Sequence, residues 1–193
     1  MSKIVALFYV IFLTLNTVHG QDIDMNLPKE KQTKLGLYVT SEEAYAMWKE
    51  SPERVKVLDV RTLDEYINIG HAEMACNIPA FLQTYEWDDE KKYFTYKMNK
   101  DFPKQIKEVY KPEDIILVTC RSGGRSALAV NLLETLGYKN TYNITDGFEG
   151  DLVNDPENAN HGKRMKNGWK NAGLPWTYKV DLKLMKIPKT NNL

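Results

Sequence analysis

Short apolar runs rich in β-branched residues alternate along this chain with segments whose apolar residues recur at helical spacing. The runs predict buried strands and the helical segments predict amphipathic helices. This alternation predicts an α/β fold, a single domain whose mainly parallel central sheet has helices on both faces. The predicted strands cover residues 55–60, 74–78, 114–119 and 141–145. The predicted helices cover residues 40–50, 64–69, 101–110 and 125–136.

Two of these helices carry boundary signals. Thr40 stands three residues before Glu43 at the start of the first helix, which is the pattern of a capping box. Gly137 follows the last helix and predicts its end, because glycine readily adopts the left-handed backbone of a helix terminus.

Aromatic residues gather in a segment that fits neither pattern, and two tryptophans lie near the C-terminus. Because aromatic side chains pack more often than they bind ligands, we expect the segment to cap the core, with the wall of a substrate pocket as the alternative. We expect Trp169 and Trp176 to close the domain. The aromatic residues of the segment 81–98 are Phe81, Tyr85, Trp87, Tyr93, Phe94 and Tyr96.

The first residues have the pattern of an export signal. Lys3 precedes an apolar stretch at residues 4–15, and small residues follow at 18–20. The stretch is shorter than the roughly 20 residues of a membrane-spanning helix. We expect residues 1–20 to be a cleaved signal peptide and the protein to be periplasmic or secreted, with no membrane attachment after cleavage; an uncleaved anchor is the alternative.

The charge balance and the cysteine count exclude some classes of partner and of fold. The 26 basic and 26 acidic side chains balance, which argues against nucleic acid or an anionic membrane surface as partner. Two cysteines are too few for a disulfide scaffold.

We expect Cys76 to be a small buried residue of a central strand. The alternatives are a disulfide between Cys76 and Cys120, or a role for Cys76 in resolving a covalent intermediate on Cys120. His71 and His161 have no second ligand nearby in sequence, so we expect no metal and no cofactor.

The candidate chemistry lies at residues 120–126, which read Cys-Arg-Ser-Gly-Gly-Arg-Ser between a predicted strand and a predicted helix. Backbone N–H groups of a glycine-bearing turn, the helix dipole and two arginines all favour an anion in such a loop. Cys120 in that field favours the thiolate, the form that attacks electrophilic sulfur. The segment therefore predicts a nucleophilic cysteine.

The spacing of this loop indicates a reaction class. Arg125 lies five residues after Cys120, whereas cysteine phosphatases have one residue more between the two. The loop resembles the active-site loop of rhodanese-type sulfurtransferases, whose cysteine carries sulfur as a persulfide. The resemblance implies that Cys120 is the sulfur carrier and that Arg121 and Arg125 orient an anionic donor such as thiosulfate. It also implies that the persulfide is held by the amides of Ser122, Gly123, Gly124, Arg125 and Ser126.

The resemblance extends well beyond the loop. Val-Leu-Asp-Val-Arg at residues 57–61, then Glu65, Gly-His at 70–71 and Asn-Ile-Pro at 77–79 follow the order of rhodanese motifs. The ending at residues 168–176 is similar to that of exported bacterial single-domain rhodaneses.

Two side chains of these motifs, Arg61 and Glu65, are expected to form a structural ion pair. A supporting contact from Asp59 to the cysteine loop is a further expectation. One departure is Ala-Glu-Met-Ala at residues 72–75, where the family usually has Ile-Pro-Gly-Ala.

These features predict an N-terminal extension at residues 21–35, a rhodanese-like domain at 36–180 and a C-terminal tail at 181–193. The predicted activity is transfer of sulfur from a small sulfur-containing anion, through the Cys120 persulfide, to a thiophilic acceptor such as cyanide, a thiol or a protein. A non-enzymatic sulfur carrier or anion-binding module is the main alternative. Phosphatase or arsenate reductase chemistry is a weaker one, because of the loop spacing.

Overall fold

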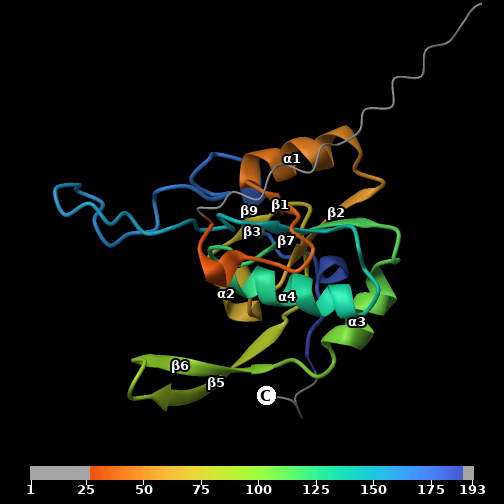
Figure 1. Cartoon of the computed structure of the whole chain (residues 1–193), viewed down its shortest axis with the longest axis horizontal. Coiled ribbons are helices and arrows are strands. Elements are labelled where there is room, and N and C mark those ends of the chain that lie inside the picture. The colour runs from red at the N-terminus through yellow and green to blue at the C-terminus, as the bar shows by residue number, and fades with distance from the viewer. Residues whose placement is uncertain (1–26, 189–193) are drawn as a thin grey trace, which may run out of the picture.

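The computed structural model describes residues 27–188 and shows an α/β fold built on one central sheet (Figure 1). The strands of that sheet are β1 (Tyr38–Val39), β2 (Val55–Asp59), β4 (Cys76–Asn77), β7 (Ile115–Thr119) and β8 (Thr141–Ile144). Their order is β1-β8-β7-β2-β4, and each neighbouring pair runs parallel. Two antiparallel pairs lie outside it and comprise β3 (His71–Ala72) with β9 (Trp176–Thr177) and β5 (Phe81–Asp88) with β6 (Tyr93–Met98).

Helices cover both faces of the sheet, with α1 on one face and α3 and α4 on the other (Figure 1). The described α-helices are α1 (Ser41–Glu50), α2 (Leu63–Asn68), α3 (Phe102–Val109) and α4 (Gly124–Thr135). Ala44 of α1 packs with Phe148 in one buried cluster, while Ile106 of α3 and Val130 of α4 pack in a second. The predicted fold class is therefore confirmed.

The helix-start signal read from the sequence is confirmed, and a second one accompanies it. The Thr40 side chain accepts a hydrogen bond from the Glu43 N–H, and the Glu43 carboxylate accepts one from the Thr40 N–H. Thr62 and Glu65 form the same reciprocal pair at the start of α2. Each box satisfies two donors that a helix terminus would otherwise leave without partners.

A strand lies within the predicted range 74–78, but β4 has only two residues, and its expected central position is wrong because it lies at the edge of the sheet. Met185 extends this edge through a parallel bridge to Asn77, and the Lys186 N–H donates to the Asn77 carbonyl at 2.9 Å. Cys76 is nevertheless buried, as expected, and both Cys76 and Cys120 are free thiols.

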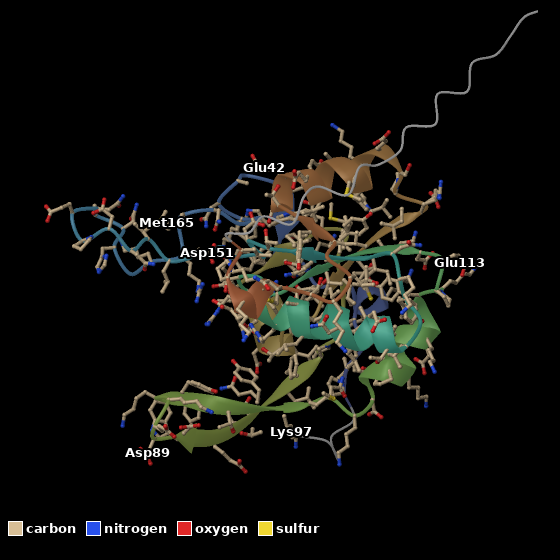
Figure 2. All side chains as sticks on the ribbon, in the orientation of Figure 1. Glu42, Asp89, Lys97, Glu113, Asp151 and Met165 are labelled. Carbon is tan, nitrogen blue, oxygen red and sulfur yellow. The ribbon has the colours of Figure 1, made fainter. Side chains whose placement is uncertain are left out.

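The expectation that the aromatic segment caps the core is also wrong. The segment forms the β5–β6 hairpin, which extends away from the central sheet, and Figure 2 shows Asp89 at its far end. Phe81 packs against the core, but the other aromatic side chains of the hairpin are exposed to solvent. Aromatic content alone did not reveal this, because a two-stranded hairpin has no second layer against which to pack.

The two C-terminal tryptophans close the α1 side of the domain, as predicted. Trp169 is 1% exposed and its ring meets Tyr45 of α1 edge to face. Trp176 in β9 contacts Phe148 in the same manner, with ring centroids 6.3 Å apart. These contacts bring the segment 169–176 onto the buried cluster under α1.

A long arm leaves the domain between β8 and β9 (Figure 1). Its two sides meet through bridges between Leu152 and Arg164 and between Val153 and His161. Figure 2 shows Asp151 near the body of the domain and Met165 farther out on the arm. The arm thus brings Arg164 back toward the domain from a distant part of the sequence.

The signal peptide predicted at residues 1–20 lies outside the described residues. Within residues 27–188, no helix combines the length and apolar character needed to cross a membrane.

Candidate active site

Cys120 lies directly after β7, at the carboxyl end of a strand in the middle of the sheet. Only 1% of the surface of Cys120 is accessible to solvent. The Sγ atom accepts a hydrogen bond from the Gly123 N–H at 3.2 Å and one from the Ser126 hydroxyl at 3.3 Å. Two donors aimed at one sulfur stabilise negative charge there.

The loop needs glycine at the position that precedes α4. Gly123 has a φ of +96°, and a Cβ added there would lie 2.2 Å from the Thr145 carbonyl oxygen. The Ala127 N–H makes the first helical hydrogen bond, to the Gly123 carbonyl. The N–H groups of Gly124, Arg125 and Ser126 precede that bond, so the positive end of the helix faces the loop.

The turn after β8 forms backbone hydrogen bonds with the cysteine loop. The Phe148 N–H donates to the Cys120 carbonyl at 2.8 Å, and the Glu149 N–H donates to the Arg121 carbonyl at 2.9 Å. Gly147 packs so closely that an added Cβ would lie 2.7 Å from the Cys120 carbonyl oxygen. These contacts fix the backbone whose N–H groups face the thiol.

Glu65 pairs with Arg125 rather than with Arg61, so the predicted Arg61–Glu65 ion pair is wrong. The Arg125 guanidinium donates to both carboxylate oxygens of Glu65, at 2.7 and 2.5 Å. Burial raises the pKa of Glu65, but the hydrogen bonds and charge of Arg125 outweigh burial and hold that pKa below its ordinary value. The same pair raises the pKa of Arg125, against the effect of its burial. Glu65 therefore fixes the arginine beside the cysteine loop.

Replacing Glu65 with glutamine is expected to destabilise the protein by about 2 kcal/mol at pH 7, because Arg125 loses its charged partner. A carboxylate with a lowered folded pKa stabilises the fold above its unfolded pKa, and this contribution is lost as pH falls through the folded value. The deficit of Glu65→Gln should therefore begin to shrink as pH falls below the ordinary glutamate value of about 4.3, and it should disappear only below the lower folded value. Urea unfolding at several pH values measures it.

Glu43→Gln is the matched control, because Glu43 occupies the same capping-box position in α1 and glutamine also suits that position. Its unfolding midpoint should remain close to that of the parent chain. An equal loss in both variants would show that the cap, rather than the ion pair with Arg125, accounts for the effect.

Arg121 and Arg164 supply positive charge at the outer side of the loop. Arg121 is exposed, and the Arg164 guanidinium donates to the Gly150 carbonyl at 2.8 Å. The Gly150 N–H in turn donates to the Arg121 carbonyl. Burial, followed by repulsion from Arg121, lowers the pKa of Arg164, and the charges of Glu149 and Asp151, followed by Cys120, oppose this. Within residues 27–188, neither arginine has a carboxylate oxygen within 4.0 Å.

Sequence reasoning missed Arg164, because it is separated from the cysteine loop by β8 and half of the arm. Of the predicted site residues, the structure brings Gly123 and Ser126 to the Cys120 sulfur. Ser126, expected to act through its backbone amide, contacts the sulfur through its hydroxyl group. Arg125 lies beside them with its charge engaged by Glu65.

Asp59 does not contact the cysteine loop through its carboxylate but pairs with Arg61. The shortest contact of this buried pair is 2.6 Å, and Arg61 also donates to the Gly70 carbonyl. The Arg61 guanidinium carbon lies 4.2 Å from the ring centroid of Phe148, which braces the loop. The Nδ1 atom of His71 lies 3.0 Å from the Tyr66 carbonyl oxygen.

The described residues hold no group of three or more His, Cys, Asp or Glu side chains arranged to bind a metal ion. The arrangement around Cys120 instead offers a thiol, hydrogen-bond donors and cations. These groups suit attack by sulfur on an anionic substrate.

Comparisons with known proteins agree with this geometry. Residues 40–152 match the family described as the Rhodanese-like domain. An uncharacterized protein of Rickettsia conorii is 35% identical over 144 residues, covering 72% of this chain and 96% of that protein. Thiosulfate sulfurtransferase 18 of Arabidopsis thaliana is 39% identical over 93 residues, covering 47% of this chain and 62% of that protein. The crystal structure of Rv0390 from M. tuberculosis has a TM-score of 0.56 and 26% identity, covering 73% of this chain and 96% of that chain.

Proposed function

Because this chain belongs to the rhodanese-like domain family, we propose that it is a sulfurtransferase that carries sulfur as a persulfide on Cys120. The observation that carries the proposal is the pair of donors, the Gly123 N–H and the Ser126 hydroxyl, aimed at the Cys120 sulfur. The name of the Arabidopsis thaliana relative, a thiosulfate sulfurtransferase, supports thiosulfate as a donor. The proposal concerns a small anion as substrate and involves no cofactor.

In the first step the Cys120 thiolate attacks the outer sulfur of thiosulfate. A bond forms between Sγ and that sulfur, the sulfur–sulfur bond of thiosulfate breaks, and its electron pair leaves with sulfite. Arg121 and Arg164 reduce the cost of bringing this dianion to a thiolate, since neither is engaged by a carboxylate of the described chain within 4.0 Å. The loop donors stabilise the charge that remains on the persulfide.

In the second step a nucleophile such as cyanide or a thiolate attacks the terminal sulfur of the persulfide. The bond between this sulfur and Sγ breaks, and the electron pair returns to Cys120 as thiolate. Arg125, fixed by Glu65, lies beside the thiol and stabilises the thiolate that reforms. No external oxidant or reductant is consumed.

The intact mass of the protein after treatment with thiosulfate tests this proposal. We expect a gain of one sulfur atom, about 32 Da, which cyanide then removes. Repeated rounds of thiocyanate production support an enzyme, whereas a single round of loading without turnover supports a sulfur carrier. A protein that keeps a free Cys120 thiol and gains no mass with thiosulfate or polysulfide would contradict the proposed chemistry.

A further inference from the structure

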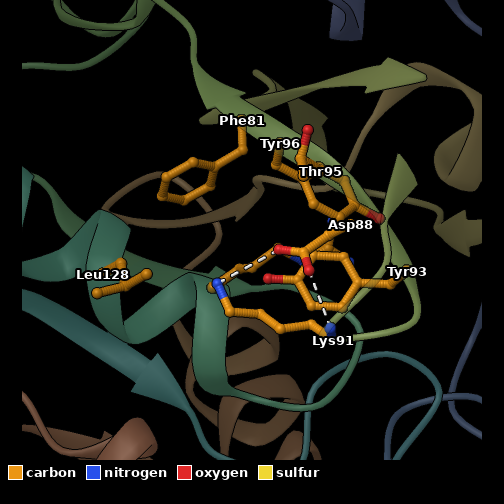
Figure 3. A pocket seen from close by; sticks show the side chains of 8 residues that line it. Phe81, Asp88, Lys91, Tyr93, Thr95, Tyr96 and Leu128 are labelled. Carbon is orange, nitrogen blue, oxygen red and sulfur yellow. Dashed lines mark hydrogen bonds and ion pairs between the residues drawn. The ribbon is translucent and has the colours of Figure 1, made fainter. Parts of the chain in front are cut away.

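An open pocket of about 380 Å³ lies between the β5–β6 hairpin and α4 (Figure 3). Its apolar walls are Phe81 at the start of β5, Tyr93 and Tyr96 from β6, and Leu128 from α4. A volume of this size lies in the range that holds small organic ligands. Two of the exposed aromatic residues of the hairpin, Tyr93 and Tyr96, thus line this pocket.

The charged groups that line this pocket are already neutralised. The Asp88 carboxylate accepts hydrogen bonds from the Lys91 N–H at 2.9 Å and the Glu90 N–H at 3.0 Å, and Lys91 Nζ lies 3.6 Å away (Figure 3). Arg125, the remaining charged group of the lining, is held by Glu65. The pocket therefore suits an uncharged organic group, whereas Arg121 and Arg164 on the donor side have no carboxylate oxygen within 4.0 Å among residues 27–188.

Arg125 joins the pocket to the nucleophile. Its guanidinium carbon lies 5.4 Å from the ring centroid of Tyr96, inside the pocket wall. The same side chain belongs to the segment 120–126, which begins with Cys120 and leads into α4. A ligand seated against Tyr96 and Leu128 would therefore lie against a side chain of the cysteine loop.

We propose that this pocket binds the organic body of the acceptor thiol, and that it favours uncharged thiols carrying an aromatic or aliphatic group. The inference rests on the proposed function. The acceptor thiolate forms a bond to the terminal sulfur of the Cys120 persulfide, the bond of that sulfur to Sγ breaks, and the electron pair stays on Sγ. The acceptor leaves as a persulfide, so donor and acceptor use different surfaces beside one cysteine.

Single-turnover discharge of the loaded protein tests the pocket. The protein is loaded with thiosulfate and discharged with benzyl mercaptan or with 2-mercaptoethanol, two alkyl thiols of which the second lacks an apolar body. In the parent chain the rate should saturate with benzyl mercaptan and rise linearly with 2-mercaptoethanol. Leu128→Trp fills the pocket from an exposed helix position, and Tyr93→Ala removes part of its aromatic wall.

We expect each of these two variants to lower the rate ratio of benzyl mercaptan to 2-mercaptoethanol about tenfold. Leu182→Trp, at another exposed leucine outside the pocket, is the matched control and should keep the parent ratio. Normal loading with an unchanged ratio in Leu128→Trp and Tyr93→Ala overturns the acceptor pocket alone. A parent protein that no sulfur donor loads overturns both the pocket and the proposed function.

Discussion

Replacing Cys120 with serine is expected to abolish persulfide formation and to lower sulfur transfer by a factor on the order of 10⁴ or more. A serine hydroxyl is not ionised near neutral pH and cannot hold a sulfane sulfur, whereas a thiolate can. The fold should persist, because the Gly123 N–H and the Ser126 hydroxyl at 3.2 and 3.3 Å can also donate to an oxygen. Intact mass after thiosulfate treatment and thiocyanate production by cyanide measure the two effects.

Cys76→Ser is the matched control for this experiment. Burial raises the pKa of the Cys76 thiol, so Cys76 stays protonated and is a poor nucleophile at neutral pH. The Cys76→Ser protein should therefore load with sulfur as the parent does. Loading that survives in Cys120→Ser and disappears in Cys76→Ser would place the nucleophile on β4 and overturn the assignment.

The parts of the site that could be predicted from sequence are those fixed by local backbone geometry. A buried strand, a turn with Gly123 and a helix start lie within one short stretch, so the order of residues alone places Cys120 at the positive end of α4. The capping box of Thr40 and Glu43 is local in the same way. Local patterns of this kind also gave the alternation of strands and helices.

The parts that sequence could not predict depend on contacts between distant segments. Arg61 and Glu65 are close enough in sequence to pair, yet Glu65 at the start of α2 pairs with Arg125 at the start of α4. Arg164 comes near the loop because the returning side of the arm pairs with its outgoing side, where Arg164 lies opposite Leu152 and donates to the Gly150 carbonyl. The hairpin aromatics were misassigned because an apolar residue is equally compatible with a core and with an open pocket wall.

The buried pair of Asp59 and Arg61 was also unpredicted, and it gives the largest effect expected on stability. Both side chains have 0% exposure, and their shortest contact is 2.6 Å. Burial lowers the pKa of the Arg61 guanidinium, but the Asp59 carboxylate outweighs burial, so Arg61 remains charged in the core. Removing the carboxylate leaves this charge without its partner, in a place that water does not reach.

Asp59→Asn is therefore expected to destabilise the protein by about 3–5 kcal/mol, although it preserves the volume of the side chain. The midpoint of urea unfolding, compared with that of the parent chain, measures the loss. Asp89→Asn is the contrasting control, because its side chain is 91% exposed and its partner Lys92 lies 4.0 Å away, so its midpoint should hardly change.

The combined variant Asp59→Leu with Arg61→Met identifies the cause of this loss. It removes the charge of Arg61 together with its partner, so it should be more stable than Asp59→Asn, since an apolar pair carries no desolvated ion. The alternative cause is a weaker hydrogen bond from the Arg61 N–H, which lies 2.9 Å from the Asp59 carboxylate, because the amide oxygen of asparagine is a poorer acceptor than a carboxylate oxygen. In that case the combined variant would be at least as unstable as Asp59→Asn, because leucine accepts no hydrogen bond. The order of the two unfolding midpoints therefore decides whether the buried charge or the turn after β2 makes Asp59 necessary.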